Sequence, residues 1–268
     1  MGDRTETYTH GHAEAVLRSH RWRTVDNSAA HVAPRLVPGA SVLDVGCGPG
    51  TITVDIARRV APGRVVGIDA SAEVVAEAQA FAAEAGVALE LAVGDVYALD
   101  HPDDAFDVVH AHQVLQHLAD PVAALREMRR VCRSGGAVAV RDGIYRAFAW
   151  HPSAPGIDRW LEVYCAVAEA NGGEPDAGTH LRAWAMEAGF TSVEATGTCW
   201  TYATDEDRRW WADLWADRST RTALADRAVE LGLASRDELD EIAAAWRTWA
   251  KQPGGCFVVP HGEILATP

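Results

Sequence analysis

Positive charge is scarce in this chain of 268 residues. It has 24 lysines and arginines against 38 aspartates and glutamates, so its formal net charge at pH 7 is −14. Phosphate backbones and anionic membrane surfaces attract proteins with a surplus of positive charge, and an acidic chain is a poor partner for both. The composition therefore argues against nucleic acid as a substrate and against a membrane surface as a partner.

The cysteines lack the spacing of a zinc site. There are five of them, an odd number, and no two stand in a CxxC pattern. Such usage is typical of reduced thiols in a cytoplasmic protein. The N-terminal stretch 1–20 has no apolar core of a signal peptide, and no apolar run approaches the ~20 residues that a membrane-spanning helix needs. We expect a cytoplasmic protein without a signal peptide, a transmembrane helix or a metal site.

Hydrophobic residues, in contrast, are plentiful. They make up 48% of the chain against 23% for charged residues, which predicts a packed core. The length fits one α/β domain with additions, although two domains are also allowed. Strand and helix patterns alternate from Ser41 onward, which favours a parallel sheet. The predicted strands cover residues 41–45, 64–69, 88–93, 107–112, 136–141, 191–202 and 255–260.

Capping residues mark the starts of the predicted helices. Ser71 and Asp120 cap two of them, and Pro121 occupies the first helical position after Asp120. Two further helices lie between the last two predicted strands. They begin at Thr204 and Ser235, each of which is followed three residues later by an acid, as in a capping box. The chain before the first strand is expected to form two helical segments separated near residue 26.

A glycine-spaced loop joins the first predicted strand to the helix that follows it. Strand, glycine loop and helix together bring a backbone against a nucleotide-like ligand. Gly46, Gly48 and Gly50 do not match the dinucleotide pattern G-x-G-x-x-G, whose third glycine would fall on Thr51. Asp44, two residues before the loop, can face a ligand amino group and would repel a pyrophosphate. A nicotinamide-dependent oxidoreductase and an ordinary strand-to-helix turn remain alternatives.

Two more acids follow predicted strands. Asp69 ends the second strand and can accept both hydroxyls of a ribose, with a simple helix cap before Ser71 as the alternative. Asp95 follows the third strand and could accept the exocyclic amine of adenine, while Val96 offers a neighbouring backbone N–H. The alternative for Asp95 is an Asx-turn at the strand end. Both acids fit an adenosine ligand.

The loop and the region after it resemble one enzyme family. The D-x-G-x-G-x-G form that starts at Asp44 resembles motif I of class I S-adenosylmethionine (SAM) dependent methyltransferases. Residues 105–136 then carry F-D-x-V, L-x-H, D-P, L-x-E-x-x-R-V and G-G in that order. This series resembles the signature of UbiE/COQ5-like methyltransferases, and the resemblance extends from about residue 23 to residue 145.

The resemblance implies a Rossmann-like three-layer sandwich. Its sheet would have seven strands, five of them parallel, with an antiparallel C-terminal hairpin and a helical cover. We expect one domain, 1–268, with an N-terminal helical lid (1–36), a SAM-binding core (37–145) and a substrate side (146–268). The lid would include Tyr8, His12 and His20. The oligomeric state, monomer or homodimer, stays open.

The family transfers a methyl group from SAM to carbon, oxygen or nitrogen of small molecules, leaving S-adenosylhomocysteine (SAH). A SAM enzyme with other chemistry, such as a cyclase, and a non-enzymatic SAM-binding protein are the open alternatives. The resemblance implies contacts to each part of the cofactor. They are Asp44, Gly46, Cys47, Gly48 and Gly50 at the methionine, Asp69 and Ala70 at the ribose, Asp95 and Val96 at the adenine, and the backbone near His112 and Gln113 at the amine.

Catalysis requires a nucleophile in line with the S–CH₃ bond, and a base only if that nucleophile must lose a proton. His117 is the best candidate for the base, because it follows the fourth strand and histidine titrates near neutral pH. Asp142, after the fifth strand, could orient a histidine or bind a substrate hydroxyl. Some family members use a histidine and an acid at these places. The alternatives are a fold-supporting hydrogen bond for His117 and a turn residue for Asp142.

Tryptophan is concentrated in the second half of the chain. Nine of the ten tryptophans lie between Trp150 and Trp249. Each taken alone is expected to pack in the core or between helices. Collectively they suggest an aromatic-walled pocket for a planar or lipophilic acceptor.

Overall fold

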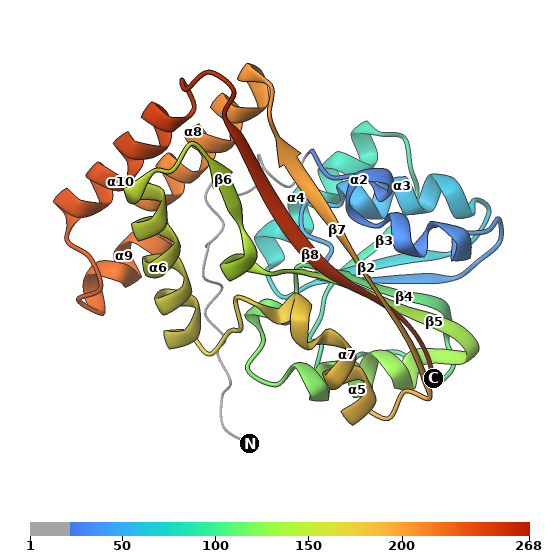
Figure 1. The fold of residues 1–268 in the computed structure, drawn as a ribbon. Coiled ribbons are helices and arrows are strands. Elements are labelled where there is room, and N and C mark those ends of the chain that lie inside the picture. The colour runs from blue at the N-terminus through green and yellow to red at the C-terminus, as the bar shows by residue number, and fades with distance from the viewer. Residues whose placement is uncertain (1–21) are drawn as a thin grey trace.

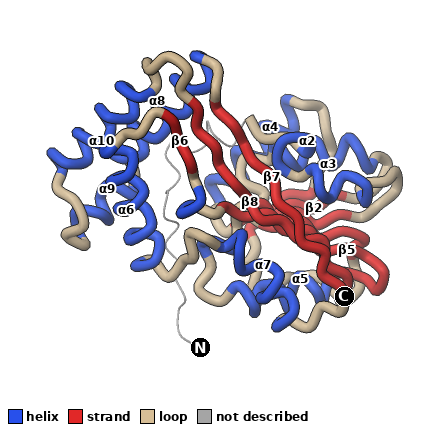
Figure 2. Tube along the Cα trace, in the orientation of Figure 1, coloured by secondary structure: helices blue, strands red, loops and turns tan. Residues whose placement is uncertain are grey.

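The computed structural model describes residues 22–268, which form a mixed sheet with helices on both faces and a helical cover at one end (Figure 1). Figure 2 shows the strands running continuously from the sheet toward that cover. The expected lid residues Tyr8, His12 and His20 lie outside the described residues. The α/β class with a mostly parallel sheet is confirmed.

Five parallel strands form the core of the sheet. They are β1 (Val42–Val45), β2 (Val65–Asp69), β3 (Glu90–Val93), β4 (Phe106–His112) and β5 (Cys132–Gly143), in the order β3-β2-β1-β4-β5. All five strands coincide with predicted ones. Their carboxyl ends meet along one edge of the sheet, which is where ligands bind in folds of this class.

Three antiparallel strands complete the sheet. β8 (Cys256–Thr267) pairs with β5, β7 (Ser192–Tyr202) pairs with β8 along its whole length, and β6 (Ala149–His151) pairs with the first residues of β8. Counted over residues 22–268, the sheet therefore has eight strands rather than the expected seven. The eighth strand, β6, has only three residues and forms by pairing with β8, so it carries no alternating pattern that the sequence could reveal.

Helices cover the two faces of the core. On one face lie α2 (Val25–Ser28), the 3₁₀ turn η1 (Ala30–Arg35), α3 (Thr51–Val60) and α4 (Ala72–Glu84). The opposite face carries α5 (Pro121–Val131) and α7 (Ala177–Glu187). The predicted caps are in place, because Ser71 accepts from the Val74 N–H and Asp120 accepts from the Ala123 N–H. The second of the expected N-terminal helices is instead a short α-helix followed by the 3₁₀ turn, which contains Pro34.

The helical cover consists of α6 (Pro155–Ala170), α8 (Asp205–Arg221), α9 (Ala223–Glu230) and α10 (Arg236–Trp249), at the left of Figure 1. It has its own hydrophobic core, in which Trp160, Trp215 and Trp246 are almost fully buried. The ring centroids of Trp160 and Trp215 are 4.4 Å apart in an edge-to-face arrangement. These three tryptophans fill the interior of the cover, as the packing alternative requires, and the expected aromatic-walled pocket stays a prediction for the others.

β7 and β8 connect the cover to the core. β8 pairs with β5 from Gly143↔His261 to Val138↔Ala266, whereas its first residues lie against the cover's core through Phe257. One continuous strand thus fixes the cover relative to the ligand-binding edge. Within residues 22–268, no helix is both long enough and apolar enough to cross a membrane.

Candidate functional site

The glycine loop after β1 depends on glycine at all three positions. Gly46, Gly48 and Gly50 have φ of 66°, 55° and 82°, which is the left-handed region that L side chains rarely adopt. A Cβ atom on Gly46 would also lie 2.4 Å from Cγ2 of Val114. The loop therefore brings its backbone close to the segment that follows β4, and no larger residue could replace Gly46.

Most of the loop's N–H groups are used inside the protein. Cys47 N donates to Ile68 O (2.9 Å), Gly48 N donates to Asp69 Oδ2 (3.1 Å), and Gly50 N donates to Cys47 O (3.1 Å). A phosphate-binding loop instead directs several backbone N–H groups at its ligand. The commitment of these three donors fits a nucleoside ligand without phosphate and disfavours a dinucleotide. Burial also raises the pKa of the Cys47 thiol, so it stays protonated.

Asp44 lies behind the loop. Its carboxylate is 2% exposed, its Oδ2 accepts a hydrogen bond from Thr53 Oγ1 (2.6 Å), and its Oδ1 lies 2.7 Å from His110 Nδ1. The side chain therefore ties β1 to α3 and β4. The expected contact with a ligand amino group could use only the lone pairs that these two bonds leave.

Asp69 and Ala70 stand at the carboxyl end of β2. Asp69 is half-buried and accepts from Gly48 N through Oδ2 and from Ser71 N through Oδ1, both at 3.1 Å. It is thus part of the turn before α4, as the helix-cap alternative requires. Each carboxylate oxygen can still accept one more bond, so hydroxyls of a ribose remain possible donors. Ala70 is exposed at the same edge.

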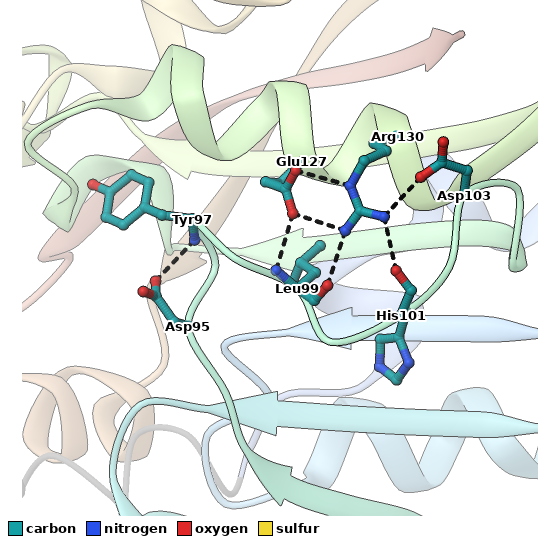
Figure 3. Close-up of polar contacts among 7 residues, drawn as sticks. All are labelled: Asp95, Tyr97, Leu99, His101, Asp103, Glu127 and Arg130. Atoms are coloured by element: carbon teal, nitrogen blue, oxygen red, sulfur yellow. Dashed lines mark hydrogen bonds and ion pairs between the residues drawn. The ribbon is translucent and has the colours of Figure 1, made fainter.

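Asp95 is exposed and forms an Asx-turn, in which its Oδ1 accepts from Tyr97 N at 2.8 Å (Figure 3). This is the alternative raised for it, and its second oxygen remains at the surface. Val96 is half-buried against the core. The loop that carries both residues follows β3 without a helix of its own.

An ion pair on α5 holds that loop in place. Arg130 donates to the carbonyl oxygens of Leu99 and His101, each at 2.8 Å, and Glu127 accepts from Leu99 N at 3.0 Å (Figure 3). Glu127 and Arg130 are also bonded to each other. They are the acid and the arginine of the L-x-E-x-x-R-V pattern. The sequence contained this signal, but nothing in it indicated that the pair fixes the loop at Asp95.

The chain leaves β4 through a strained turn. Gln113 has a φ of 54°, which is uncommon for a residue with a side chain and frequent at functional sites. Its Oε1 accepts from Arg23 Nη2 (2.5 Å), and its Nε2 lies 3.0 Å from His261 Nε2. The preceding His112 is buried, and burial together with the charges of Arg23 and Arg141 holds its pKa well below the ordinary value. His112 is therefore neutral near pH 7.

His117 and Asp142 are joined through a residue that sequence reasoning missed. Gln116 N donates to Asp142 Oδ1 (3.3 Å), Gln116 Oε1 accepts from Gly143 N (3.2 Å), and Gln116 Nε2 lies 3.1 Å from His117 Nε2. Burial raises the pKa of Asp142 to about 8. Burial and the nearby charges of Arg23 and Arg218 lower the pKa of His117 to about 3. Near pH 7, Asp142 is mostly protonated and His117 is neutral.

The residues expected at the cofactor follow the ends of β1, β2, β3 and β4, and the register between these strands places them on one edge. The two candidate catalytic residues lie next to that edge, after β4 and at the end of β5. Among residues 22–268, no group of three or more His, Cys, Asp and Glu side chains could hold a metal ion. A parallel sheet with a D-x-G-x-G-x-G loop and an acid after each of the next two strands defines a class I methyltransferase fold.

Comparison with known proteins gives the family. Residues 36–180 match the family model of a methyltransferase domain. The chain is 32% identical over 270 residues to an uncharacterised methyltransferase of Schizosaccharomyces pombe, with 96% of this chain and 95% of that protein covered. The chain therefore belongs to the methyltransferase domain family, and it is a class I enzyme that uses SAM as its cofactor.

Two further similarities fit this assignment. The C-methyltransferase UbiE of ubiquinone and menaquinone biosynthesis from Bdellovibrio bacteriovorus is 37% identical over 102 residues, which are 38% of this chain and 43% of that protein. The crystal structure of the [4+2]-cyclase SpnF has a TM-score of 0.56 at 24% identity, covering 89% of this chain and 79% of that chain. The second similarity concerns the fold alone.

Proposed function

We propose that this enzyme transfers the methyl group of SAM to a small, apolar or aromatic metabolite by in-line displacement at the sulfonium. The observation that carries the proposal is the glycine loop. It has three glycines at positive φ and three N–H groups committed within the protein, next to the half-buried carboxylate of Asp69. This geometry suits a nucleoside that carries a sulfonium and no phosphate.

The residues that would hold SAM follow the order of the strand ends. The methionine part would lie at the loop, with Asp44 behind it, and the adenosine would extend toward β2 and β3. Acids and backbone groups would then face each part of the ligand. They are Gly46, Cys47, Gly48 and Gly50 for the methionine, the backbone of His112 and Gln113 for its amine, Asp69 and Ala70 for the ribose, and Asp95 and Val96 for the adenine.

SAM, when bound, supplies a methyl group that is already activated on a cationic sulfur. The protein then has to orient the acceptor, exclude water and, for a hydroxyl or amine acceptor, take up a proton. Asp142 suits that last role in its ionised form, which is the minor form near pH 7 because its pKa is about 8, whereas His117, with a pKa of about 3, is too weak a base to hold the proton. Asp142 Oδ2 has no hydrogen-bond partner among residues 22–268.

We also infer a single domain in which residues 146–268 form the acceptor side, and a cytoplasmic location. The continuous strand β8, shared by core and cover, supports the first inference. Five unpaired cysteines, three of them buried, support a reducing compartment.

The test is production of SAH from SAM by the purified chain with a panel of phenols, aromatic acids, apolar amines and quinols. We expect SAH to form only when one of these acceptors is present, with a matching methylated product by mass spectrometry. The control is Asp142→Asn, which we expect to bind SAH but to methylate a hydroxyl acceptor more slowly. If the chain binds SAH but no acceptor is methylated, a SAM enzyme with other chemistry becomes the better account.

A further inference from the structure

A group of buried basic side chains lies on the face of the sheet opposite to Asp142. Arg141 on β5, His112 on β4 and His261 on β8 are 1%, 6% and 1% exposed, and their positions are adjacent across the sheet. The ring of Trp200 on β7 covers the Arg141 guanidinium at 4.7 Å. We call these four residues the Arg141 cluster.

Several hydrogen-bonding atoms of the Arg141 cluster have no partner. Five such atoms lack a hydrogen-bond partner among residues 22–268. They are the two Nη atoms of Arg141, the two ring nitrogens of His112 and Nδ1 of His261. Buried polar groups are almost always paired. A concentration of unpaired ones in one place therefore requires an explanation. Because the Gln113 amide donates to His261 Nε2, the Nδ1 of His261 carries the ring proton.

Among residues 22–268, the carboxylate that bonds to Arg141 belongs to Glu263, which already takes three hydrogen bonds and lies 3.8 Å from His31 Nδ1. Glu263 accepts from Arg141 Nε (3.0 Å), from Thr198 Oγ1 (2.5 Å) and from Thr196 Oγ1 (3.1 Å). Arg23 adds a second positive charge nearby, since it stacks on Trp200 at 5.4 Å. Glu263 bonds only to Nε of Arg141, so both Nη groups remain available for a bidentate partner.

The cluster begins at His112, whose backbone is expected at the methionine amine, and extends from there away from the other expected cofactor contacts. Neighbouring strands lie about 4.8 Å apart, so β5 and β8 are about 5 and 10 Å beyond β4, on the side away from β2 and β3. The adenosine would occupy the β2 and β3 side. The β5 and β8 side is left for the methyl acceptor.

We propose that the Arg141 cluster binds a carboxylate of the methyl acceptor, and that the acceptor is an aromatic carboxylic acid. This rests on the proposed methyl transfer. The carboxylate takes both Nη groups of Arg141 and the Nδ1–H of His261. The aromatic part lies against Trp22, Trp200 and Trp210, whose rings are 5.4 Å (Trp22 to Trp200) and 6.0 Å (Trp22 to Trp210) apart.

Residues 22–27 lie against the cluster. Trp200 Nε1 donates to Asn27 O (2.6 Å), Arg23 bonds to Gln113, and Trp22 itself is 41% exposed. An acid therefore reaches Arg141 only when this segment moves away from Trp200. Its return would shield the bound acceptor from water, as closure does in many enzymes.

The test is calorimetric titration of the full chain after saturation with SAH. The two titrants are 2-naphthoate and the neutral, similarly shaped 2-naphthamide. A bidentate contact to arginine predicts that the acid binds at least about tenfold more tightly than the amide. In the double variant Arg141→Met, Glu263→Gln, which leaves no unpaired carboxylate, this preference should fall to less than about twofold. Arg141→Lys, which keeps the charge without the fork, should lose part of it.

Arg182→Met is the matched control, because Arg182 is an exposed arginine on α7 and its removal should leave the preference unchanged. Equal binding of acid and amide to the unaltered chain, or no saturable binding of the acid, would overturn the proposal without any variant. Loss of SAH affinity in the double variant, in step with loss of the acid, would assign the cluster to the cofactor's own carboxylate and also overturn it. Absence of SAH binding to the unaltered chain would instead count against the proposed function.

Discussion

Asp69 is the side chain on which the cofactor edge most depends. It orders the glycine loop through Gly48 N and the start of α4 through Ser71 N, and it keeps acceptor capacity for a ribose. We predict that Asp69→Ala weakens SAH binding by about 10- to 100-fold, because both the loop order and the ribose contact are lost. Calorimetric titration with SAH measures this. Glu84→Ala, an exposed acid near the end of α4, should change the affinity by less than about twofold.

Asp142 makes a distinct prediction about pH and stability. Its pKa is raised by burial from 3.8 to about 8, so between those values the unfolded chain loses a proton that the folded chain keeps. The contribution of this group to stability is therefore full below about pH 4 and is lost as the pH rises to 8. In Asp142→Asn the loss is absent. Between pH 5 and pH 8, the free energy of unfolding of the variant should therefore rise relative to that of the unaltered protein by up to several kcal/mol.

Urea unfolding of both proteins at several pH values checks this prediction. The unfolding free energy of one protein must be subtracted from that of the other, because four histidines also change stability with pH. Their pKa values are lowered, so they destabilise the fold as the pH falls below 6.5; they are His31, His112, His117 and His261. Those histidines are present in both proteins and cancel. A difference in unfolding free energy that stays constant from pH 5 to pH 8 would mean that Asp142 is ionised in the folded protein.

At the scale of elements, much of the fold could be predicted because local signals and tertiary structure agree. Buried strands such as β1 read as apolar β-branched runs, and the caps at Ser71 and Asp120 are where their side chains predict helix starts. The family signature then supplied the residues that we expect at the cofactor. β6 escaped prediction because three residues have no periodicity, and they become a strand only by pairing with β8.

Contacts between elements were harder to predict from the sequence. The tryptophan stripes of α8 and α10 correctly indicated buried helix faces, but a stripe does not show whether it faces another helix or a ligand. Gln116 gave no signal at all, since its role comes from bonds to Asp142 and Gly143 across β5. The Arg141 cluster joins four strands that are far apart in sequence, so it becomes visible only in the folded chain.

The link between α5 and the loop after β3 can be tested as a unit. In Arg130→Gln the carbonyl contacts at Leu99 and His101 are lost, and we predict a loss of about 1–3 kcal/mol in unfolding free energy with faster hydrogen exchange in residues 95–105. Arg126→Gln, on the same helix but 54% exposed, serves as the control. Unchanged exchange in 95–105 would show that the loop keeps its position without the ion pair.

Packing in the helical cover should affect the stability of the protein without affecting its affinity for the cofactor. Trp246 is fully buried among Trp160, Trp249 and Phe257, so Trp246→Ala should cost about 3–5 kcal/mol of stability. Because the cover contributes no expected cofactor contact, SAH affinity at low temperature should stay within about twofold of the unaltered protein. Denaturant unfolding and SAH titration give the two values. A large loss of SAH affinity in a variant that is still folded would mean that the cover reaches the cofactor.

At the scale of the whole molecule, the long pair β7 and β8 determines how the parts work together. Its C-terminal half completes the sheet beside β5, and its other half enters the core of the cover. The Arg141 cluster lies between these halves and next to the carboxyl edge of β4. A cofactor at the loop and an acceptor at the cluster would thus approach each other from neighbouring strands of one continuous sheet.

Transfer of a labelled methyl group would show directly whether this chain methylates small molecules. The unaltered chain and Asp69→Ala would each be incubated with trideuteromethyl SAM and the panel of small aromatic acceptors, and the products followed by mass spectrometry. We predict that the label moves to an acceptor in step with SAH formation, and that Asp69→Ala at low SAM concentration transfers at least about tenfold less. A chain that binds SAH tightly yet moves no label to any acceptor would contradict methyl transfer to small molecules of this class.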